Sequence, residues 1–202
     1  MKIPFFASFI IFIVWLAYEL SKTRRHSEKK KTSFWEREAE ANRTRRKTLD
    51  HLKYITIPFD TLPMHTLEND ERVAEYHQIL YSLNDSPIVN FTGISNTDLK
   101  LEYGAPNINL LMKYDENYTT LAGTLQRWAL KLYEAGYVTE TKAILEFAVS
   151  TYTDVTGTYR LLASIYTAEG HPEKIADLLK IAENLGSGSK DIIVRILQKS
   201  DR

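Results

Sequence analysis

Five histidines are the side chains best suited to acid–base or metal chemistry near neutral pH, because imidazole titrates there. They are His26, His51, His65, His77 and His171. No two of them follow the His-x-x-x-His or His-Glu-x-x-His spacing that puts two metal ligands on one face of a helix. The chain also has no cysteine, which excludes thiolate metal sites and disulfides. We therefore expect no metal site.

The other residue types that carry catalysis lack the patterns that catalysis needs. No serine stands in a Gly-x-Ser-x-Gly turn, and the glycines at 186 and 188 are too few and too far from any strand to form a phosphate loop. Carboxylate pairs such as Asp115-Glu116 are typical of helix surfaces. We expect no catalytic residue and no cofactor. The alternative, an enzyme with an unrecognised site, would be favoured by a deep polar pocket near His65 or His77.

The charge of the 202-residue chain is zero overall but is divided unevenly. Residues 1–53 hold 13 lysines and arginines against 6 aspartates and glutamates, whereas residues 54–202 hold 13 against 20. The two parts are therefore expected to serve different purposes. The basic cluster at 22–31 lacks interleaved aromatic residues and the remainder is acidic, so a nucleic-acid partner is not expected.

An uncharged apolar run from Ile3 to Tyr18 predicts a single transmembrane anchor over 1–20. Lysines and arginines follow the run, and this excess predicts a signal anchor that keeps the later domain on the cytoplasmic side of a membrane. The lipid bilayer is then a partner of residues 3–20 and of the basic flank. A cleaved signal peptide is disfavoured because its charge would precede the run. The opposite orientation, with an extracytoplasmic domain, stays an alternative.

Residues 21–53 are expected to form a basic juxtamembrane segment and a stalk helix, with Ser33 and Glu36 as a capping box at the start of that helix. Residues 54–119 are expected to be the irregular and helical N-terminal part of the domain. A helix over 67–83, capped by Thr66, is predicted there, as are a short helix starting at Ser95 and another starting at Pro106.

A 34-residue repeat organises the region from Ala122 to Gly186. The offset pairs residues of similar type along two stretches: Trp128 with Leu162, Ala129 with Ala163, Leu132 with Tyr166, Gly136 with Gly170, Leu145 with Leu179 and Ala148 with Ala182. Small residues at fixed places and a glycine between two amphipathic runs predict stacked helix pairs. The fold class expected is all-α, a short α-solenoid over 120–202 that ends in a capping helix with Ile192, Ile193, Ile196 and Leu197 buried.

These positions resemble the tetratricopeptide repeat, and the second unit matches it better than the first. The first unit has Thr141 where alanine is usual, and neither unit has the closing proline. The resemblance implies an inner groove, lined by fixed positions of each first helix, that binds a protein or peptide. Carried over, the groove residues are Gly123, Gln126, Leu130 and Tyr133, then Gly157, Arg160, Ser164 and Thr167. Arg160 is expected to bind a carboxylate or a backbone carbonyl, since its planar guanidinium presents several hydrogen-bond donors side by side.

The expected function is therefore that of a protein–protein interaction scaffold or adaptor on the cytoplasmic face of a membrane. The alternatives are an extracytoplasmic tethered assembly or chaperone factor and, from a different class, the enzyme named above.

Overall fold

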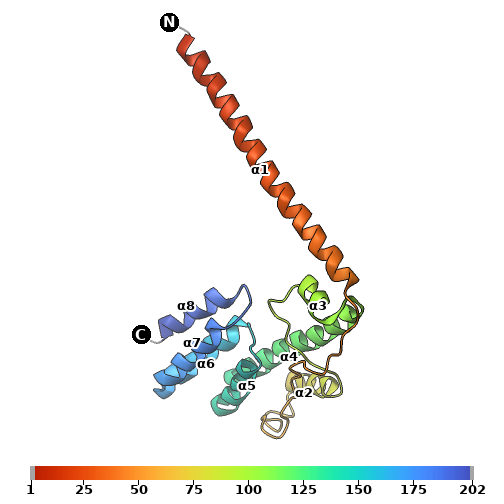
Figure 1. The fold of residues 1–202 in the computed structure, drawn as a ribbon. Helices are drawn as coiled ribbons and strands as arrows, with labels where there is room; N and C mark the ends of the chain where they lie inside the picture. The colour runs from red at the N-terminus through yellow and green to blue at the C-terminus, as the bar shows by residue number, and fades with distance from the viewer. Residues whose placement is uncertain (1–2, 201–202) are drawn as a thin grey trace. The chain divides into compact units, whose positions relative to one another are not determined.

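The computed structural model describes the backbone of residues 3–200 and the side chains of residues 8–20, 22 and 33–200. Within this range the chain is all-helical, with 70% of its residues in helix and no strand (Figure 1). It divides into two compact units. One is Met1–Lys47 with Asn96–Pro106, and the other is Thr48–Ser95 with Asn107–Arg202. Each unit is described by itself below.

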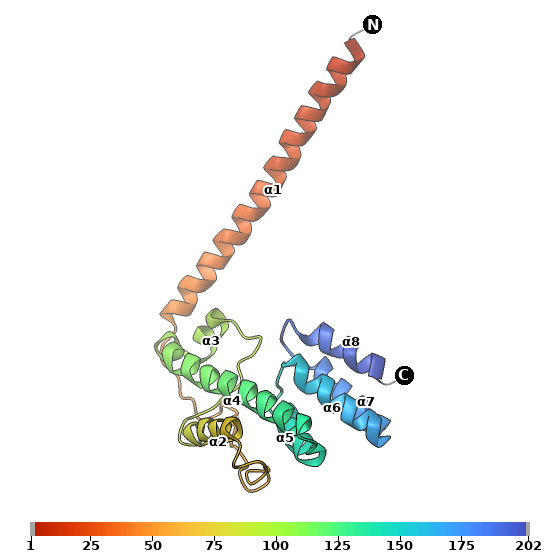
Figure 2. The ribbon, with the colours of Figure 1, turned by 180° about the vertical axis from the view of Figure 1, so that it is seen from behind.

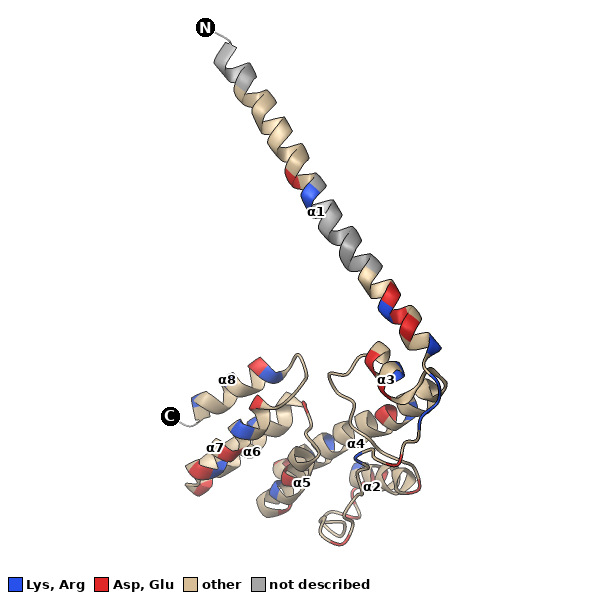
Figure 3. Ribbon diagram, in the orientation of Figure 1, with Lys and Arg blue, Asp and Glu red and all other residues tan. Residues whose placement is uncertain are grey.

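Helix α1 runs from Ile3 to Arg43. No helix in the described part of the chain is long and apolar enough to cross a membrane, so the predicted transmembrane anchor, the signal anchor and the single-pass membrane localisation are wrong. The described charged residues of α1 lie in two places, at Glu19 and Lys22 and again from Glu36 to Arg43 (Figure 3).

The predicted start of a separate stalk helix at Ser33 is also wrong, because α1 continues through this position without a break. Its residues 21–43 contain neither glycine nor proline, so nothing in the sequence stops the helix. The predicted basic flank lies outside the described side chains except for Lys22.

The last turns of α1 pack against helix α3, which spans Asn96–Tyr103. Glu38 accepts a hydrogen bond from the Thr97 hydroxyl at 2.6 Å and pairs with the Lys100 ammonium. The Lys100 ammonium also donates to Asn42 at 2.8 Å. The predicted short helix beginning beside Ser95 is thus present, and polar side chains hold it to α1.

In the second unit, helix α2 spans Glu71–Asn84 and begins later than predicted. Its cap is Asp70, whose carboxylate accepts hydrogen bonds from the amides of Arg72 and Val73 at 3.0 and 3.2 Å. The expected cap, Thr66, lies in a turn that precedes the helix. Asp70 is favoured because its carboxylate also pairs with Lys131 at 2.9 Å, which ties the start of α2 to the next long helix.

That long helix, α4, spans Ile108–Glu134 and follows a single 3₁₀ turn, η1, at Ala105–Asn107. The sequence predicted one helix from Pro106 and another at the start of the solenoid, from Thr120, but the two form one helix. Its buried side chains are spaced alternately by three and four residues, which marks one continuous face: Leu111, Tyr114, Tyr118, Leu121, Leu125, Trp128 and Leu132. No glycine or proline between 108 and 122 interrupts this pattern.

Four helices follow: α5 (Val138–Ser150), α6 (Thr156–Glu169), α7 (Pro172–Glu183) and α8 (Lys190–Ser200). Each packs against the helix before it, and α8 packs on both α6 and α7. Because the connections are short, α4, α6 and α8 run in one direction and α5 and α7 return (Figures 1 and 2). Ile193 and Leu197 are the buried residues of α8, whereas Ile192, which was predicted to be buried, is exposed.

Residues related by the 34-residue offset occupy comparable places in the two helix pairs. Ala129 and Ala163 are both fully buried, so α4 and α6 can each be approached closely at that turn. Gly136 and Gly170 both follow the first helix of a pair with positive φ, at 88° and 75°. Thr141 is buried as well, and its hydroxyl donates to the Tyr137 carbonyl at 2.8 Å, which satisfies a polar group where alanine was expected.

Candidate functional site

Three of the predicted groove residues present free side chains on α4 and α6. Leu130 and Tyr133 lie one turn apart on α4 with 43% and 40% of their surface exposed. Arg160 is exposed on α6 and forms no hydrogen bond or ion pair with any other described residue. The three residues are called the α4–α6 face below.

Gln126, also predicted to bind a partner, is instead part of the packing between α4 and α6. Its side-chain oxygen accepts a hydrogen bond from the buried Thr158 hydroxyl at 2.7 Å. A Cβ atom at Gly157 would lie 2.8 Å from the Gln126 amide nitrogen, so this side chain rests directly on the start of α6. Sequence reasoning missed Thr158. The contact places the start of α6 beside Gln126.

Ser164 and Thr167 use their hydroxyl donors within α6. Ser164 donates to the Leu161 carbonyl at 2.7 Å and Thr167 to the Ala163 carbonyl at 2.9 Å. Such bonds to the preceding turn are common for hydroxyl side chains on helices. Of the eight predicted groove residues, two are glycines, and among the other six Leu130, Tyr133 and Arg160 keep side chains that are available to a partner.

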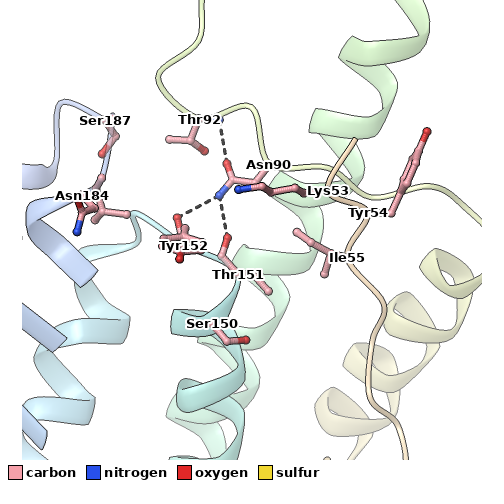
Figure 4. A pocket seen from close by; sticks show the side chains of 12 residues that line it. Lys53, Tyr54, Ile55, Asn90, Thr92, Ser150, Thr151, Tyr152, Asn184 and Ser187 are labelled. Carbon is pink, nitrogen blue, oxygen red and sulfur yellow. Dashed lines mark hydrogen bonds between the residues drawn. The ribbon is translucent and has the colours of Figure 1, made fainter. Parts of the chain in front are cut away.

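A cavity of about 410 Å³ lies elsewhere in the second unit, where four segments distant in sequence meet (Figure 4). These segments are 53–55, the loop at 90–92, the turn at 150–152 after α5 and the loop at 184–187 after α7. Asn90 joins two of them, because its amide donates to the carbonyls of Thr151 and Tyr152 at 2.9 and 3.1 Å. The sequence predicted a loop at Asn90 but not this cavity.

The turn that carries Thr151 and Tyr152 is fixed on its buried side as well. The Tyr118 hydroxyl donates to the Thr151 carbonyl at 3.2 Å, and burial raises the pKa of this phenol. Tyr152 has a φ of 58°. This left-handed conformation is unfavourable in free energy for a residue with a bulky side chain. Hydrogen bonds from both sides of the turn hold it in this conformation.

A second hollow of about 280 Å³ lies between α5, α6 and α7, and each of its charged groups has an ionic partner. The Tyr166 hydroxyl donates to the Glu146 carboxylate at 2.6 Å, and the Lys174 ammonium lies 3.6 Å from the same carboxylate. This ammonium is also 4.9 Å from the centre of the Tyr166 ring. The hollow therefore offers a ligand no unpaired charge.

The described residues contain no group of three or more histidines and carboxylates that could hold a metal ion. His65 lies 3.6 Å from Glu68 and His171 lies 2.9 Å from Glu173, both on the surface. His77 is buried, with its ring edge-on to Trp128 at 4.9 Å between centroids. Neither His65 nor His77 lines the cavity of Figure 4.

Burial beside Trp128 gives His77 a pH-dependent effect on stability. Desolvation lowers the pKa of His77, so the folded chain holds a neutral imidazole. The unfolded chain takes up a proton below about pH 6.5. The free energy of unfolding should therefore fall as the pH drops through and below this value. Urea unfolding at pH 7.5 and 5.0 should show a smaller loss in His77→Phe than in the unaltered chain.

The control for this prediction is His51→Phe, since His51 is exposed and forms no hydrogen bond or ion pair with any other described residue. This variant should keep the full loss of stability between the two pH values. An equal loss in His77→Phe and the unaltered chain would contradict the assignment.

Comparison of the chain with protein-family models, with curated proteins and with solved structures finds no match.

Proposed function

We propose that helices α4 to α8 form a tetratricopeptide-like protein-interaction module that binds a peptide segment of another protein along the α4–α6 face. This module is proposed to bind its partner without catalysing a reaction. The observation that carries it is the exposure of Leu130 and Tyr133 on α4 and of Arg160 on α6, where Arg160 is without a partner among the described residues.

The residue types of this face suit protein recognition. Tyrosine and arginine are enriched among the residues that contribute most to binding at protein interfaces. Leu130 and Tyr133, one turn apart, offer an apolar surface, and Arg160 offers a fork of hydrogen-bond donors to a carboxylate. The segment we expect to bind therefore has an apolar side chain close to an aspartate or a glutamate.

Selection from a random peptide library on the full chain tests this proposal. The peptides enriched should share an acidic residue close to an apolar one. Arg160→Ala and Tyr133→Ser should each weaken binding of a selected peptide about tenfold, measured by fluorescence anisotropy, because a residue that contributes strongly to an interface is worth about 1.4 kcal/mol or more. Neither exposed side chain is needed for folding, so the circular dichroism spectra should stay unchanged.

Met112→Ser is the matched control, since Met112 is also exposed on α4 and lies near the other end of the helix. It should leave the affinity unchanged. Selected peptides that bind Arg160→Ala and Tyr133→Ser as tightly as the unaltered chain would overturn the proposal.

A further inference from the structure

The cavity of Figure 4 has a simple charge pattern. Its lining includes one charged residue, Lys53, and no aspartate or glutamate. This is unusual for its surroundings, because residues 54–202 hold 20 acidic residues against 13 basic ones. Asp115, close by in the fold, is occupied by a hydrogen bond from the Phe91 amide at 3.1 Å. A ligand in this cavity would meet a positive charge and no negative one.

Lys53 is placed to meet such a ligand. Its side chain extends toward Asn90, with the ammonium on the cavity side, whereas Tyr54 points away (Figure 4). The Lys53 ammonium forms no hydrogen bond or ion pair with any other described residue. Thr92 and Tyr152 also line the cavity, and their hydroxyls likewise donate to no described group. These three donors are free to bind acceptors of a ligand.

The walls around these donors are held in place before any ligand arrives. Asn90 spans the gap between its own loop and the 150–152 turn with two hydrogen bonds. The loop after α7 is packed so closely on Gly93 that a Cβ there would lie 2.3 Å from the Gly186 carbonyl oxygen. Tyr152 keeps its left-handed φ of 58° at the rim. Preformed walls lower the cost of ordering a site on binding.

From these contacts we propose that the cavity binds a ligand ending in a carboxylate. One ammonium matches one negative charge, and the hydroxyls of Thr92 and Tyr152 supply hydrogen bonds to the carboxylate oxygens. Ile55 and Leu185 provide an apolar wall for the aliphatic part of the ligand. The volume of about 410 Å³ lies within the range of small-molecule sites. The carboxylate belongs either to the C-terminus of a peptide or to a free small acid.

The test is an NMR titration of the full chain with three probes. They are an N-acetylated tripeptide of alanine, alanine and valine with a free carboxylate, the same tripeptide as its C-terminal amide, and propionate. The free-carboxylate tripeptide should shift the backbone amide signals of Thr92, Tyr152 and Ser187, and the amide should not. Lys53→Met should weaken this binding at least tenfold, and Thr92→Val about threefold.

Lys113→Met is the matched control, because Lys113 is an exposed lysine of α4 that does not line the cavity. This variant should bind the free-carboxylate tripeptide with the same affinity as the unaltered chain. Binding of the tripeptide alone would assign the site to peptide C-termini, and binding of propionate as well would assign it to carboxylates in general. No shift with any probe, equal binding of the tripeptide amide, or unchanged binding in Lys53→Met would overturn the inference. Peptide binding at the α4–α6 face does not depend on any of these outcomes.

Discussion

Replacing Trp128 by alanine should lower the free energy of unfolding by about 4 kcal/mol, the largest loss that we expect from a single substitution in this chain. Trp128 is fully buried on α4, where its ring meets the edge-on ring of His77 from α2. Truncation would leave a cavity between these helices, which the surrounding backbone can fill only in part. Urea unfolding followed by circular dichroism measures the loss.

Two further variants separate packing from other effects of removing a tryptophan. Trp35→Ala should change the free energy of unfolding by no more than about 0.5 kcal/mol, since Trp35 is 65% exposed. Trp128→Phe should lose less than Trp128→Ala, because it keeps an aromatic ring and removes a buried indole N–H that has no partner among the described residues. Equal losses for Trp35→Ala and Trp128→Ala would contradict the placement of Trp128 in the core.

Replacing Gly93 by alanine should cost about 3 kcal/mol, the second largest effect. Gly93 has a φ of 85°, and an added Cβ would lie 2.3 Å from the Gly186 carbonyl oxygen. The substitution therefore combines backbone strain with a steric clash against backbone that cannot rotate away. The loop at 90–93 and the loop at 184–187 would have to separate, and we expect the unfolding midpoint in urea to fall accordingly.

Gly136→Ala is the matched control for this substitution. Gly136 has nearly the same φ, 88°, but an added Cβ there would meet no atom within 4 Å. It should cost about 1 kcal/mol from backbone conformation alone. The difference between the two variants then isolates the contact between the two loops, and two equal losses would show that this contact does not exist.

The helices from α5 onward could be predicted well because local signals mark their ends. Pro172 opens α7, Gly170 follows α6 with positive φ, and the glycines at 186 and 188 separate α7 from α8. The region before residue 135 was harder. The predicted break before Thr120 rested on the period of the repeat. The local sequence contains no residue that stops a helix there. Because the apolar face continues without interruption, residues 108–134 form the single helix α4.

Helix starts that depend on tertiary contacts were predicted incorrectly. Thr66 and Asp70 are both acceptable caps by residue type. The ion pair between Asp70 and Lys131, which lie 61 positions apart in the chain, favours the second. Similarly, Ser33 and Glu36 fit a capping box, yet both lie inside α1. A capping pattern has no effect when nothing before it ends the preceding helix.

The candidate site could be predicted only where it depends on one helix at a time. Exposure of Leu130, Tyr133 and Arg160 follows from helical spacing, since each lies outside the buried face of its own helix. The role of Gln126 could not be foreseen, because it depends on Thr158 of another helix. The cavity beside Asn90 joins four distant segments, and no local pattern encodes such a meeting.

Site-specific photo-crosslinking tests the central claim, peptide binding on the α4–α6 face, most directly. A benzophenone side chain placed at position 133 of the full chain should form an adduct with a library-selected peptide on illumination. The same group at position 112, also exposed on α4, should form none. Adducts at 133 that are lost in Arg160→Ala are the result predicted. Equal adducts at both positions, or adducts at 112 alone, would contradict the claim.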